Sequence, residues 1–532
     1  MSSSPTRELH DRLLASLQAS SARDVARLLP AGDRLDVDTF ERLILGAERR
    51  IVRIGQTNGA GAAVEPDAGQ IVLLSARNSA SWLVALATLW KRGFVPLLAD
   101  ADLARAEIAD LARQVRPAAA ILDRRADPEG GRAEDLGDSM QGLHAWIPAR
   151  RAGREPARAG QPGGSPRAAV LRLTSGTTGR PRPVAVTVEQ LLADSLNVTR
   201  TMGIRSQDAM VATIPLGHAY GFVHVFMSLL AQGTRPVLLE QPLPALLVEA
   251  LSGPGPLVMA GTPYLFELIL QAAGRRRFKG LRLALSAGAP LPERLSRAFA
   301  DRFGVPIRTF YGATECGGIC YDRSRSGIVP DGCVGMPLDG VRLGVEPVAG
   351  AEDGSGRIVV HSEAVAAGYL PPEPNGAIRP GLFLTSDLGR LGKDGALRLE
   401  GRLDRMINVG GRKVNPSEVE AILRSVPQVR DAVVFGAPDR HRGEAVCACV
   451  VAARSVTRQA LLAACADRLA PFKIPRHLEL VDRLPVTARG KTDRRALPGL
   501  IRPPSSAAAP GRLRLVRTAG PKAASARPPG SR

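Results

Sequence analysis

LTSGTTGRPRPVAVT, residues 173–187, is the stretch of this chain that indicates its fold most directly. Two short β-type runs, 169–173 and 182–186, flank a loop rich in glycine and hydroxyl side chains. Glycine permits backbone conformations that residues with a Cβ avoid, so successive N–H groups can turn toward one point while hydroxyl groups add donors. This composition predicts a phosphate cradle, and a Gly/Ser/Thr-rich hairpin turn without a ligand is the alternative.

Length and composition place the chain among large globular proteins. Its 532 residues exceed what one hydrophobic core usually contains. At about 150 residues per domain, this length predicts two to four domains. The formal net charge of +20 raises nucleic acid as a candidate partner. Against that partner, the basic residues are scattered and aromatic residues make up only 4% of the chain, so no basic run is interleaved with stacking residues.

The cysteines and the N-terminal segment bear on the cellular compartment. The six cysteines show no paired CxxC spacing, which predicts reduced thiols and no zinc site. Residues 1–13 lack the apolar core of a secretory signal, and the longest apolar run, 82–90, is too short to cross a bilayer. We therefore expect a soluble, cytoplasmic protein with no transmembrane segment.

Hydrophobic periodicity predicts an α/β fold. Residues 7–55 have helical spacing and predict one or two N-terminal helices. From residue 70 to residue 311 apolar strands alternate with helices, apart from a Gly/Pro/Arg-rich segment, 124–167, that indicates an exposed connector. Thr187 and Gln190 have capping-box spacing and predict a helix that ends near Met202. The alternation predicts parallel sheets that are covered on both faces.

Later changes of pattern predict the domain organisation. Residues 334–400 are rich in strands and turns and predict an all-β subregion. Residues 404–500 mix helical and strand patterns, and the Ala/Pro/Arg-rich tail, 501–532, has the composition of a disordered segment. We expect a large N-terminal domain, 1–403, that combines doubly covered sheets with the β-rich subregion. A small, mobile α+β domain, 404–500, follows it.

Five motifs occur in a fixed order along the chain. They are TSGTTGRPR at 174–182, SAGAP at 286–290, YGATE at 311–315, TSDLG at 385–389 with GRLDR at 401–405, and GKTDRRAL at 490–497. Together they resemble the adenylate-forming (AMP-binding) superfamily, which comprises acyl-CoA synthetases, adenylation domains of peptide synthetases and luciferases. The resemblance implies an enzyme in which a carboxylate attacks the α-phosphate of ATP, pyrophosphate leaves, and a thiol captures the acyl-adenylate.

By this resemblance the opening loop holds the β- and γ-phosphates of ATP. The residues concerned are Thr174, Ser175, Gly176, Thr177, Thr178 and Gly179. A strand rather than a helix follows the loop, so a nest of backbone N–H groups, and not a helix dipole, would attract the phosphates. Arg182 stands where the family usually has lysine, which keeps the charge but changes the donor geometry.

The YGATE and SAGAP motifs supply the implied metal and adenine contacts. Glu315 is the implied Mg²⁺ ligand, because this metal suits one or two carboxylates plus phosphate oxygens; a solvated loop acid is the alternative. Thr314 would contact the α-phosphate region. Tyr311 would stack on adenine, although a lone tyrosine is more often a core aromatic. Further implied contacts at the adenine and the acyl pocket are Ala287, Gly288, Ala289 and Gly312.

Asp387 and Arg402 resemble the two ribose contacts of the family. A carboxylate presents two acceptor oxygens, which match a vicinal diol. Ser386 precedes Asp387 where the family commonly has glycine. A surface salt bridge is the alternative for Arg402.

Lys491 is the implied catalytic lysine of adenylation. It lies in a Pro/Gly-punctuated segment from which an ammonium group can reach both the attacking carboxylate and the α-phosphate. The string GKT also suggests a Walker loop, but that loop needs glycine where Pro485 stands. Asp404 is the implied hinge of the small domain. Gly410 and Gly411 would let a pantetheine arm pass close to the backbone, with an ordinary turn as the alternative.

The acyl site is the least specific part of the resemblance. His218, in PLGHAYGF, matches an aromatic-or-histidine position near the family's acyl site, although a lone histidine is more often structural. Small residues in motifs that line the implied acyl pocket indicate room for an apolar or aryl acid. These residues are Gly221, Gly288, Gly312 and Gly317.

The expected function is that of an AMP-forming acyl-CoA synthetase of fatty or aryl acid metabolism, which uses ATP, Mg²⁺ and coenzyme A. One alternative is an acyl-AMP ligase that loads the pantetheine of an acyl carrier protein in trans. An alternative from another class is a catalytically inactive, basic nucleic-acid-associated protein. The joint presence of Glu315, Asp387 and Lys491 favours an enzyme, because an inactive scaffold would not require all three.

Overall fold

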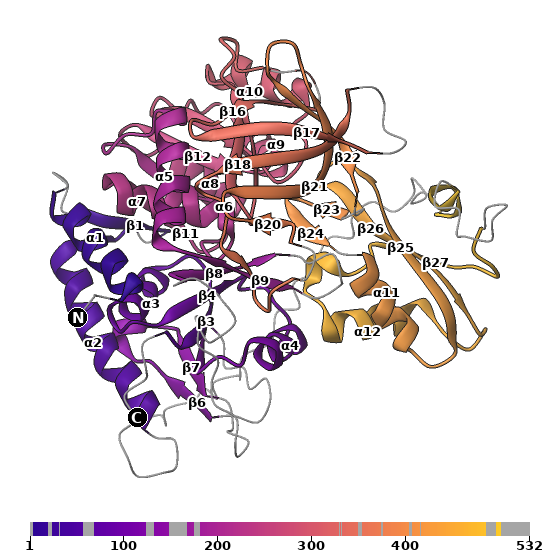
Figure 1. The fold of residues 1–532 in the computed structure, drawn as a ribbon, viewed down its shortest axis with the longest axis horizontal. Coiled ribbons are helices and arrows are strands. Elements are labelled where there is room, and N and C mark those ends of the chain that lie inside the picture. The colour runs from indigo at the N-terminus through magenta and orange to yellow at the C-terminus, as the bar shows by residue number, and fades with distance from the viewer. Residues whose placement is uncertain are drawn as a thin grey trace, which may run out of the picture.

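The computed structural model describes residues 4–19, 24–30, 32–56, 69–123, 132–147, 168–174, 181–328, 330, 332–348, 354–373, 376–403, 407–414, 416–485 and 496–501. Within these ranges the chain forms two large sheets with helices on their faces and a smaller C-terminal unit, which lies to one side of the main body (Figure 1). This α/β architecture confirms the expected fold class.

The larger sheet, here called the central sheet, is parallel from β14 to β1 and antiparallel elsewhere. In the described residues its strand order is β17-β18-β21-β22-β16-β15-β14-β13-β12-β10-β11-β1-β2, and β20 pairs with β21. The strands of the parallel half are short apolar runs, as expected where both faces are buried. They are β1 (Asp24–Leu29), β10 (Ala209–Ala212), β11 (Arg235–Leu239), β12 (Leu257–Gly261), β13 (Leu281–Ser286) and β14 (Ile307–Ala313), and β2 (Arg34–Asp36) joins β1 antiparallel.

The remaining strands of the central sheet are antiparallel. This half corresponds to the all-β subregion predicted from residue 334 onward, and it also includes the strand that returns from β14. Its strands are β15 (Gly317–Tyr321), β16 (Cys333–Pro337), β17 (Val341–Pro347), β18 (Gly356–Ser362), β20 (Ile378–Arg379), β21 (Leu382–Leu391) and β22 (Leu397–Arg402).

The second large sheet, here called the N-terminal sheet, contains the strands on both sides of the opening loop. Its order in the described residues is β19-β9-β8-β4-β3-β5-β7-β6. The strands are β3 (Ile71–Ser75), β4 (Val95–Ala99), β5 (Ala119–Leu122), β6 (Arg132–Asp135), β7 (His144–Ile147), β8 (Val170–Thr174), β9 (Arg182–Val186) and β19 (Gly368–Tyr369). β19 is distant in sequence and pairs Tyr369 with Val184 of β9.

The main hydrophobic core lies between the two large sheets. Because side chains alternate along a strand, Val258 and Ala260 of β12 enter this core, whereas Leu257 and Met259 pack with α8, α9 and α10 on the opposite face. The helices of the main body are α1 (Pro5–Ala19), α2 (Val37–Gln56), α3 (Ala80–Lys91), α4 (Arg105–Val115), η1 (Asp138–Met140), α5 (Val188–Met202), α6 (Ala219–Gly221), η2 (Phe222–Met227), α7 (Ser228–Gln232), α8 (Pro244–Leu251), α9 (Pro263–Ala272) and α10 (Glu293–Phe303).

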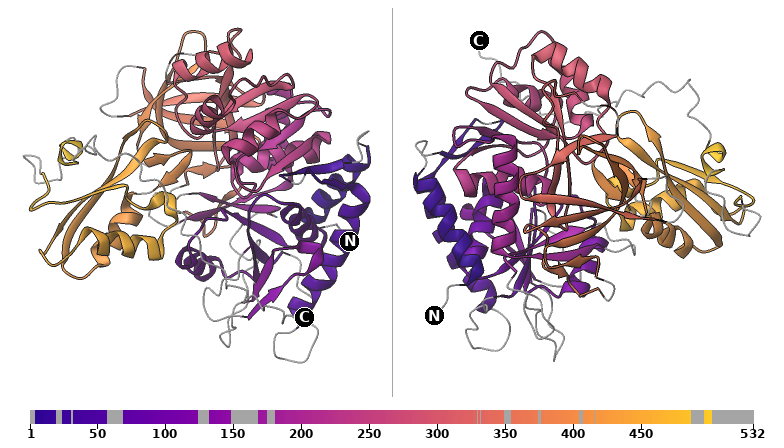
Figure 2. Two further views of the ribbon diagram at one scale, coloured as in Figure 1. Left: turned by 180° about the vertical axis from the view of Figure 1, so that it is seen from behind. Right: turned by 45° about the horizontal axis from the view of Figure 1, so that its top comes forward.

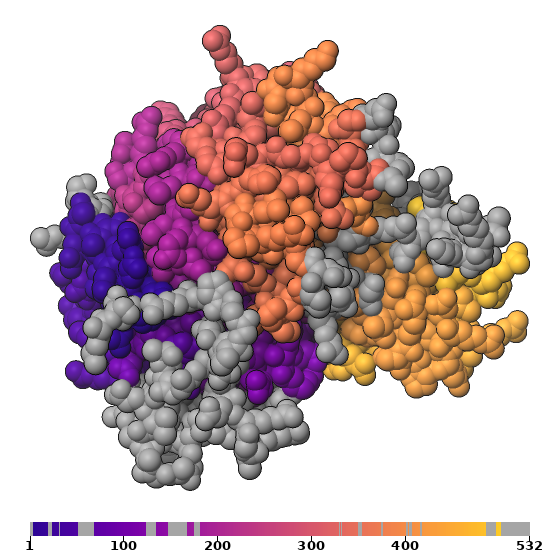
Figure 3. Space-filling model, in the orientation of Figure 1, coloured from indigo at the N-terminus to yellow at the C-terminus, as the bar shows by residue number. Residues whose placement is uncertain are grey.

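The C-terminal unit, residues 407–414 and 416–485, has a core of its own. Its sheet has the order β24-β23-β26-β25 in the described residues, with β27 beside β26, and two helices pack on it. The views in Figure 2 and the surface in Figure 3 show it as a lobe beside the main body. Its elements are β23 (Ile407–Val409), β24 (Arg412–Val414), α11 (Pro416–Ser425), β25 (Val429–Asp439), β26 (Gly443–Ala452), α12 (Arg458–Arg468), η3 (Pro471–Lys473) and β27 (His477–Leu480); η4 (Leu497–Leu500) follows.

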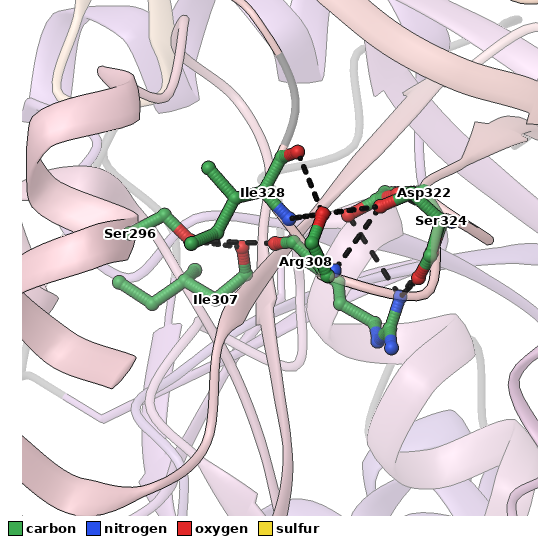
Figure 4. A network of polar contacts seen from close by, with 8 residues as sticks. Ser296, Ile307, Arg308, Asp322, Ser324 and Ile328 are labelled. Atoms are coloured by element: carbon green, nitrogen blue, oxygen red, sulfur yellow. Dashed lines mark hydrogen bonds and ion pairs between the residues drawn. The ribbon is translucent and has the colours of Figure 1, made fainter. Parts of the chain in front are cut away.

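A polar network anchors the start of β14, the strand that ends in the YGATE motif (Figure 4). Nη1 of Arg308 donates to the carbonyl oxygens of Asp322, at 3.0 Å, and Ser324, at 2.8 Å. On the other side of the strand, Oγ of Ser296 in α10 donates to the carbonyl of Ile307 at 2.9 Å. β14 is therefore fixed both to the chain that follows β15 and to the helix that precedes it.

Several details differ from the sequence prediction. The strands β1 and β2 separate the two N-terminal helices and extend the central sheet. Segment 124–167 is more than a connector, because β6 and β7 lie within it and Trp146 of β7 is 1% exposed. The large aromatic side chain gives that strand enough apolar area to join the sheet. The capping box of Thr187 and Gln190 is confirmed.

The described helices include none with the length and apolar character needed to cross a membrane. Of the tail that was predicted to be disordered, residues 502–532 lie outside the described residues.

Candidate functional site

A cavity of about 2040 Å³ lies where the central sheet, the N-terminal sheet and the C-terminal unit meet. Its wall includes the facing ends of β8 and β9, the β14–β15 turn, β21 and the β23–β24 hairpin. Every predicted site residue whose side chain the structure describes lines it, except Gly221, which is buried so closely that a Cβ on it would lie 2.3 Å from the carbonyl oxygen of Pro215. The residues that line it are Thr174, Arg182, His218, Ala287, Gly288, Ala289, Tyr311, Gly312, Thr314, Glu315, Gly317, Asp387, Gly410 and Gly411.

The other predicted site residues lie wholly or partly outside the described chain. Thr174 ends β8 and Arg182 begins β9, and Oγ1 of Thr174 donates to the carbonyl of Arg182 at 3.3 Å, so both ends of the predicted phosphate loop are placed. Arg402 pairs with Asp387 across β21 and β22, but only its backbone is described. The residues outside the described ranges are Ser175, Gly176, Thr177, Thr178, Gly179, Asp404 and Lys491.

Tyr311 and Asp387 form a direct contact at the cavity wall. The Tyr311 hydroxyl donates to Oδ2 of Asp387 at 2.6 Å, although 76 residues separate them in sequence. Burial raises the pKa of the Tyr311 phenol well above its usual range, and the adjacent Asp387 carboxylate raises it further. The backbone N–H of Asp387 donates to Oγ1 of Thr385 at 3.0 Å. The tyrosine is therefore a neutral donor that orients the carboxylate, while its ring contributes an apolar face to the cavity.

Glu315 lies in the turn between β14 and β15 and receives a hydrogen bond that sequence reasoning missed. The hydroxyl of Tyr369 in β19 donates to Oε1 of Glu315 at 3.0 Å. The guanidinium of Arg182 lies 4.0 Å from the centre of the Tyr369 ring, and its Nη1 is 2.8 Å from Oε1 of Glu373. The arginine at the family's lysine position is therefore connected to the candidate metal ligand through one aromatic ring.

Sequence reasoning could not have found Tyr369 or Glu373 as site residues. Both lie within the predicted β-rich subregion, 334–400, and belong to none of the five motifs. Only the pairing of β19 with β9 places them beside the end of the phosphate loop.

Two glycines from different parts of the chain are in close contact at the cavity. Gly288 has φ +81°, and a Cβ on it would lie 2.7 Å from Cα of Gly411. Gly411 has φ +88°, and its Cβ would lie 2.9 Å from Cγ2 of Thr262. Both positions therefore require glycine for backbone conformation and for space. The β23–β24 hairpin of the C-terminal unit is held against the SAGAP loop by this fit.

His218 lines the cavity and also has a structural role. Its Nδ1 accepts a hydrogen bond from the backbone N–H of Tyr220 at 3.2 Å, as an N-cap of α6. Burial lowers the pKa of His218, and nearby Asp100 opposes that effect. At neutral pH the ring is therefore uncharged, with its Nδ1 occupied as an acceptor.

Ion pairs hold the C-terminal unit against the main body. Nζ of Lys473 hydrogen-bonds Glu107 of α4 and lies 2.9 Å from Oε1 of Glu418 in α11, and all three side chains are largely buried. Arg412, beside the glycine pair, lies 3.0 Å from Oδ2 of Asp102. Because Glu107 and Asp102 belong to the N-terminal half, these contacts fix the hairpin at the cavity.

The metal-binding side chains at the cavity suit Mg²⁺, which takes part of its ligands from phosphate and water, better than a metal whose ligands all come from the protein. Among the described residues, no group of three or more His, Cys, Asp and Glu side chains gathers to hold a metal ion. Glu315 instead offers a carboxylate near the end of the phosphate loop, which suits a metal that binds one or two carboxylates and completes its shell with phosphate oxygens and water.

Comparison with known proteins identifies the family of the chain. The family model for the AMP-binding enzyme matches residues 64–370, and the model for the AMP-binding enzyme C-terminal domain matches residues 418–491. A 2-succinylbenzoate–CoA ligase of Bacillus cereus is 27% identical over 444 residues, which cover 81% of this chain and 89% of the relative. An oxalate–CoA ligase of Arabidopsis thaliana is 30% identical and matches over 62% of this chain and 66% of its own length.

Solved structures share the fold. An o-succinylbenzoate CoA synthetase from Bacillus subtilis superposes with a TM-score of 0.76 at 22% identity, covering 92% of this chain and 98% of that one. The amide bond synthetase McbA from Marinactinospora thermotolerans gives a TM-score of 0.75 at 24% identity, with the same coverage of both chains. On the family match, the chain belongs to the AMP-binding enzymes, the adenylate-forming superfamily of acyl-CoA synthetase type.

Proposed function

We propose that this protein is an AMP-forming acid–thiol ligase, which activates a carboxylic acid with ATP and transfers the acyl group to coenzyme A. The observation that carries the proposal is the cavity, where the Tyr311–Asp387 pair, Glu315 and the two ends of the phosphate loop face one another. Relatives that are named CoA ligases, and that match most of this chain or most of their own length, support the same reaction.

In the first half-reaction, a carboxylate oxygen of the acid attacks the α-phosphorus of ATP. The bond from that phosphorus to the bridging oxygen breaks, pyrophosphate leaves, and an acyl-adenylate forms. Anions must approach anions, so the site has to compensate charge rather than supply a nucleophile. Lys491 is the proposed cation for this step, and Arg182, which pairs with Glu373, would offer N–H donors at the end of the phosphate loop. Mg²⁺, which Glu315 would hold, supplies further positive charge to the phosphate oxygens when it is bound.

The nucleoside half of ATP has a matching set of contacts. The Asp387 carboxylate would accept hydrogen bonds from the ribose hydroxyls, in a position that the Tyr311 hydroxyl fixes. The Tyr311 ring and the Ala287–Gly288–Ala289 backbone would enclose the adenine. Arg402, opposite Asp387 in the register of β21 and β22, is the second proposed ribose contact.

In the second half-reaction, the thiol sulfur attacks the acyl carbon and loses its proton to solvent, the bond from the acyl carbon to the phosphate oxygen breaks, and AMP leaves. The Gly410–Gly411 hairpin lies at the cavity in the arrangement described here, which supports its role in passing the pantetheine arm. We place the boundary between the domains near Asp404, with 1–403 and 404–500 as the two units, and assign Asp404 as the hinge. A carrier protein's pantetheine carries the same thiol arm and is the second possible acceptor. Because ATP and coenzyme A are cytoplasmic metabolites, the cytoplasm is the proposed location.

The test is pyrophosphate release across a panel of carboxylic acids, measured with and without coenzyme A, with the thioester identified by mass spectrometry. Acid-dependent pyrophosphate release and a CoA thioester are expected for at least one acid. Acid-dependent pyrophosphate release without any CoA thioester would contradict coenzyme A as the acceptor and favour the pantetheine of a carrier protein. Absence of pyrophosphate release with every acid would refute it.

A further inference from the structure

A buried ion pair lies beside the cavity wall. Arg172 of β8 and Asp194 of α5 are 2% and 1% exposed, and Nη1 of the arginine is 3.4 Å from Oδ2 of the aspartate. Oδ1 of Asp194 accepts the backbone N–H of Gly318 at 3.0 Å. Both charged residues line the cavity. None of the five sequence motifs accounts for either of them.

The guanidinium of Arg172 is only partly satisfied. A guanidinium has five N–H donors, and neither Nε nor Nη2 of Arg172 has a hydrogen-bond partner among the described residues. The carbon of the guanidinium lies 5.5 Å from the centre of the Phe222 ring, so that face is covered by an aromatic ring. A buried donor without a partner is costly, and such an atom in a folded protein requires an explanation.

The position of the pair points to the acyl group. Gly317, which by family resemblance lines the acyl pocket, is so close that a Cβ on it would lie 2.2 Å from Cγ of Asp194. Gly318, the next residue, donates to the same carboxylate. Glycine at position 317 therefore leaves the space in which Asp194, with its partner Arg172, reaches the cavity wall.

Two further polar atoms without partners in the described ranges lie nearby, because the His224 ring centre is 4.6 Å from that of Phe310 and a Cβ on Gly318 would lie 3.1 Å from the Phe310 ring. Nδ1 of His224 lies 3.1 Å from the carbonyl of Tyr220 and must donate to it, because a carbonyl can only accept. Burial lowers the pKa of His224 to about 4, so the ring is neutral and its Nε2 is an acceptor. Within the described part of the chain, Nε2 has no hydrogen-bond partner, and the same holds for Oγ1 of Thr309. His224 and Thr309 both line the cavity.

The charges on this wall determine which kind of ligand group could satisfy these polar atoms. Asp194 already compensates the charge of Arg172, and His224 is neutral, so the wall offers hydrogen bonds without net charge. A second carboxylate on the substrate would leave two carboxylates buried against one guanidinium, which desolvation disfavours. A plain hydrocarbon would leave the donors unsatisfied. A neutral oxygen, as in a ketone or hydroxyl group, fits both conditions.

We infer that the acyl pocket ends on Arg172 and Asp194, and that the enzyme selects carboxylic acids whose far end carries a neutral oxo or hydroxyl oxygen. This inference rests on the proposed function for the identity of the pocket. It makes Arg172 a specificity-determining residue that takes no part in the reacting centre.

The test compares acids that differ only at the far end. Acetyl, isopropyl and carboxylate groups have similar shapes, so each is placed at the para position of benzoate, phenylacetate, 3-phenylpropionate and 4-phenylbutyrate. Equilibrium binding to the full-length protein is measured by calorimetry, and pyrophosphate release is measured in parallel. On at least one scaffold the acetyl acid is expected to bind about 10- to 100-fold more tightly than the isopropyl and carboxylate acids, the usual range for hydrogen bonds to a charged group.

Two variants test whether the Arg172–Asp194 ion pair causes the preference for the acetyl acid. Arg172→Met combined with Asp194→Asn removes both charges, so that no carboxylate is left buried alone, and it is expected to abolish the preference for acetyl over isopropyl. Arg172→Lys keeps the charge but loses the fork of donors, and is expected to reduce the preference. If the double variant does not fold, the single variant decides.

The outcomes separate this inference from the proposed function. Equal or weaker binding of the acetyl acid on every scaffold overturns the inference, as does a preference that is unchanged in Arg172→Lys and in the double variant. Pyrophosphate release that favours the isopropyl acid would leave the proposed function intact and overturn the inference alone. Acetyl-selective binding without pyrophosphate release would support the pocket chemistry and count against the ligase reaction.

Discussion

The hydroxyl of Tyr369 lies 3.0 Å from Oε1 of Glu315, and the Arg182 guanidinium covers the ring of the same tyrosine. Burial raises the pKa of Tyr369 above its usual range, and the Glu315 charge adds to the effect, so the phenol is a neutral donor at physiological pH. Tyr369 therefore orients the carboxylate that we assign to Mg²⁺, and it does so from a strand more than fifty residues away.

Tyr369→Phe is expected to weaken the use of Mg²⁺ without disturbing the fold. The variant keeps the aromatic ring beneath Arg182 and removes only the hydrogen bond to Glu315. Hydrogen bonds to charged groups contribute about 1.5–3 kcal/mol, so we expect the apparent KM for Mg²⁺ to rise about 10- to 100-fold. Pyrophosphate release at varied Mg²⁺ concentration measures this, and thermal melting serves as the control. An unchanged Mg²⁺ dependence would contradict the positioning role.

Lys491→Ala is expected to separate the two half-reactions. The lysine is the proposed cationic contact of the attacking carboxylate and the α-phosphate, and loss of one preorganised donor at a transition state typically costs about 10²–10³-fold in kcat. Acyl-adenylate formation should fall by at least that factor, whereas thioester formation from supplied acyl-adenylate should be largely retained. Rapid-quench measurement of each half-reaction tests this, and equal losses in both would refute the assigned role.

Glu107→Gln is expected to slow the thiol half-reaction selectively. Glu107 carries a negative charge across the interface to Lys473, and its Oε2 also accepts the backbone N–H of Ala104 at 2.9 Å as a helix cap. Glutamine can keep the hydrogen bond that caps the helix but has no negative charge. The variant therefore weakens only the contact with Lys473 that docks the C-terminal unit. With the Gly410–Gly411 hairpin held less firmly at the cavity, thioester formation from acyl-adenylate should slow about tenfold, as a loss of about 1.4 kcal/mol predicts.

Glu418→Gln is the matched control for that experiment. It removes the other carboxylate beside Lys473, but Glu418 belongs to the C-terminal unit, so the contact across the interface remains. Half-reaction rates of the two variants are to be compared at equal folded fraction. If both variants slow thioester formation equally, or if Glu107→Gln slows adenylation as much as the second step, docking by Lys473 is not the cause.

The stability of the protein is expected to fall between about pH 6.5 and pH 5, in part through His224. Burial lowers the pKa of His224 to about 4, whereas the unfolded chain protonates this residue near its ordinary value. The unfolded state therefore binds more protons in this window, and the free energy of unfolding decreases as the pH decreases.

His224→Asn isolates that contribution. Asparagine can keep a donor to the Tyr220 carbonyl but has no proton to gain. The loss of unfolding free energy from about pH 6.5 to pH 5 should be smaller in the variant by up to about 2 kcal/mol, from 1.36 kcal/mol per pH unit. Urea denaturation at the two pH values measures the difference. Equal losses in both proteins would show that His224 is not buried in its neutral form.

Local sequence pattern predicted most of the elements, because periodicity and caps act within a few residues. The helix that starts after Thr187 follows from its capping box, and β3, β4 and β12 follow from continuous apolar runs. The same reasoning missed β6 and β7, because their segment resembles a loop in composition and they become strands by pairing with β5 and with each other.

For the candidate site, the sequence determined the residue types and their order, since each motif is a short local string that needs only its own neighbours. It therefore placed Glu315, Tyr311 and Asp387 in one proposed function before any contact was known. Only the tertiary structure decided which side chains meet. Tyr369 reaches Glu315 because β19 pairs with β9, and Gly411 meets Gly288 because the C-terminal unit docks on the main body.

The acyl pocket illustrates the same division most clearly. Arg172 and Asp194 are ordinary residues in the sequence, one in an apolar strand and the other in a helix, and no spacing links them. Burial makes them significant, because a desolvated guanidinium must find a charge and donors without partners require an acceptor. Motif chemistry is local and can be read from the chain, whereas burial and pairing depend on contacts between distant segments and exist only in the folded molecule.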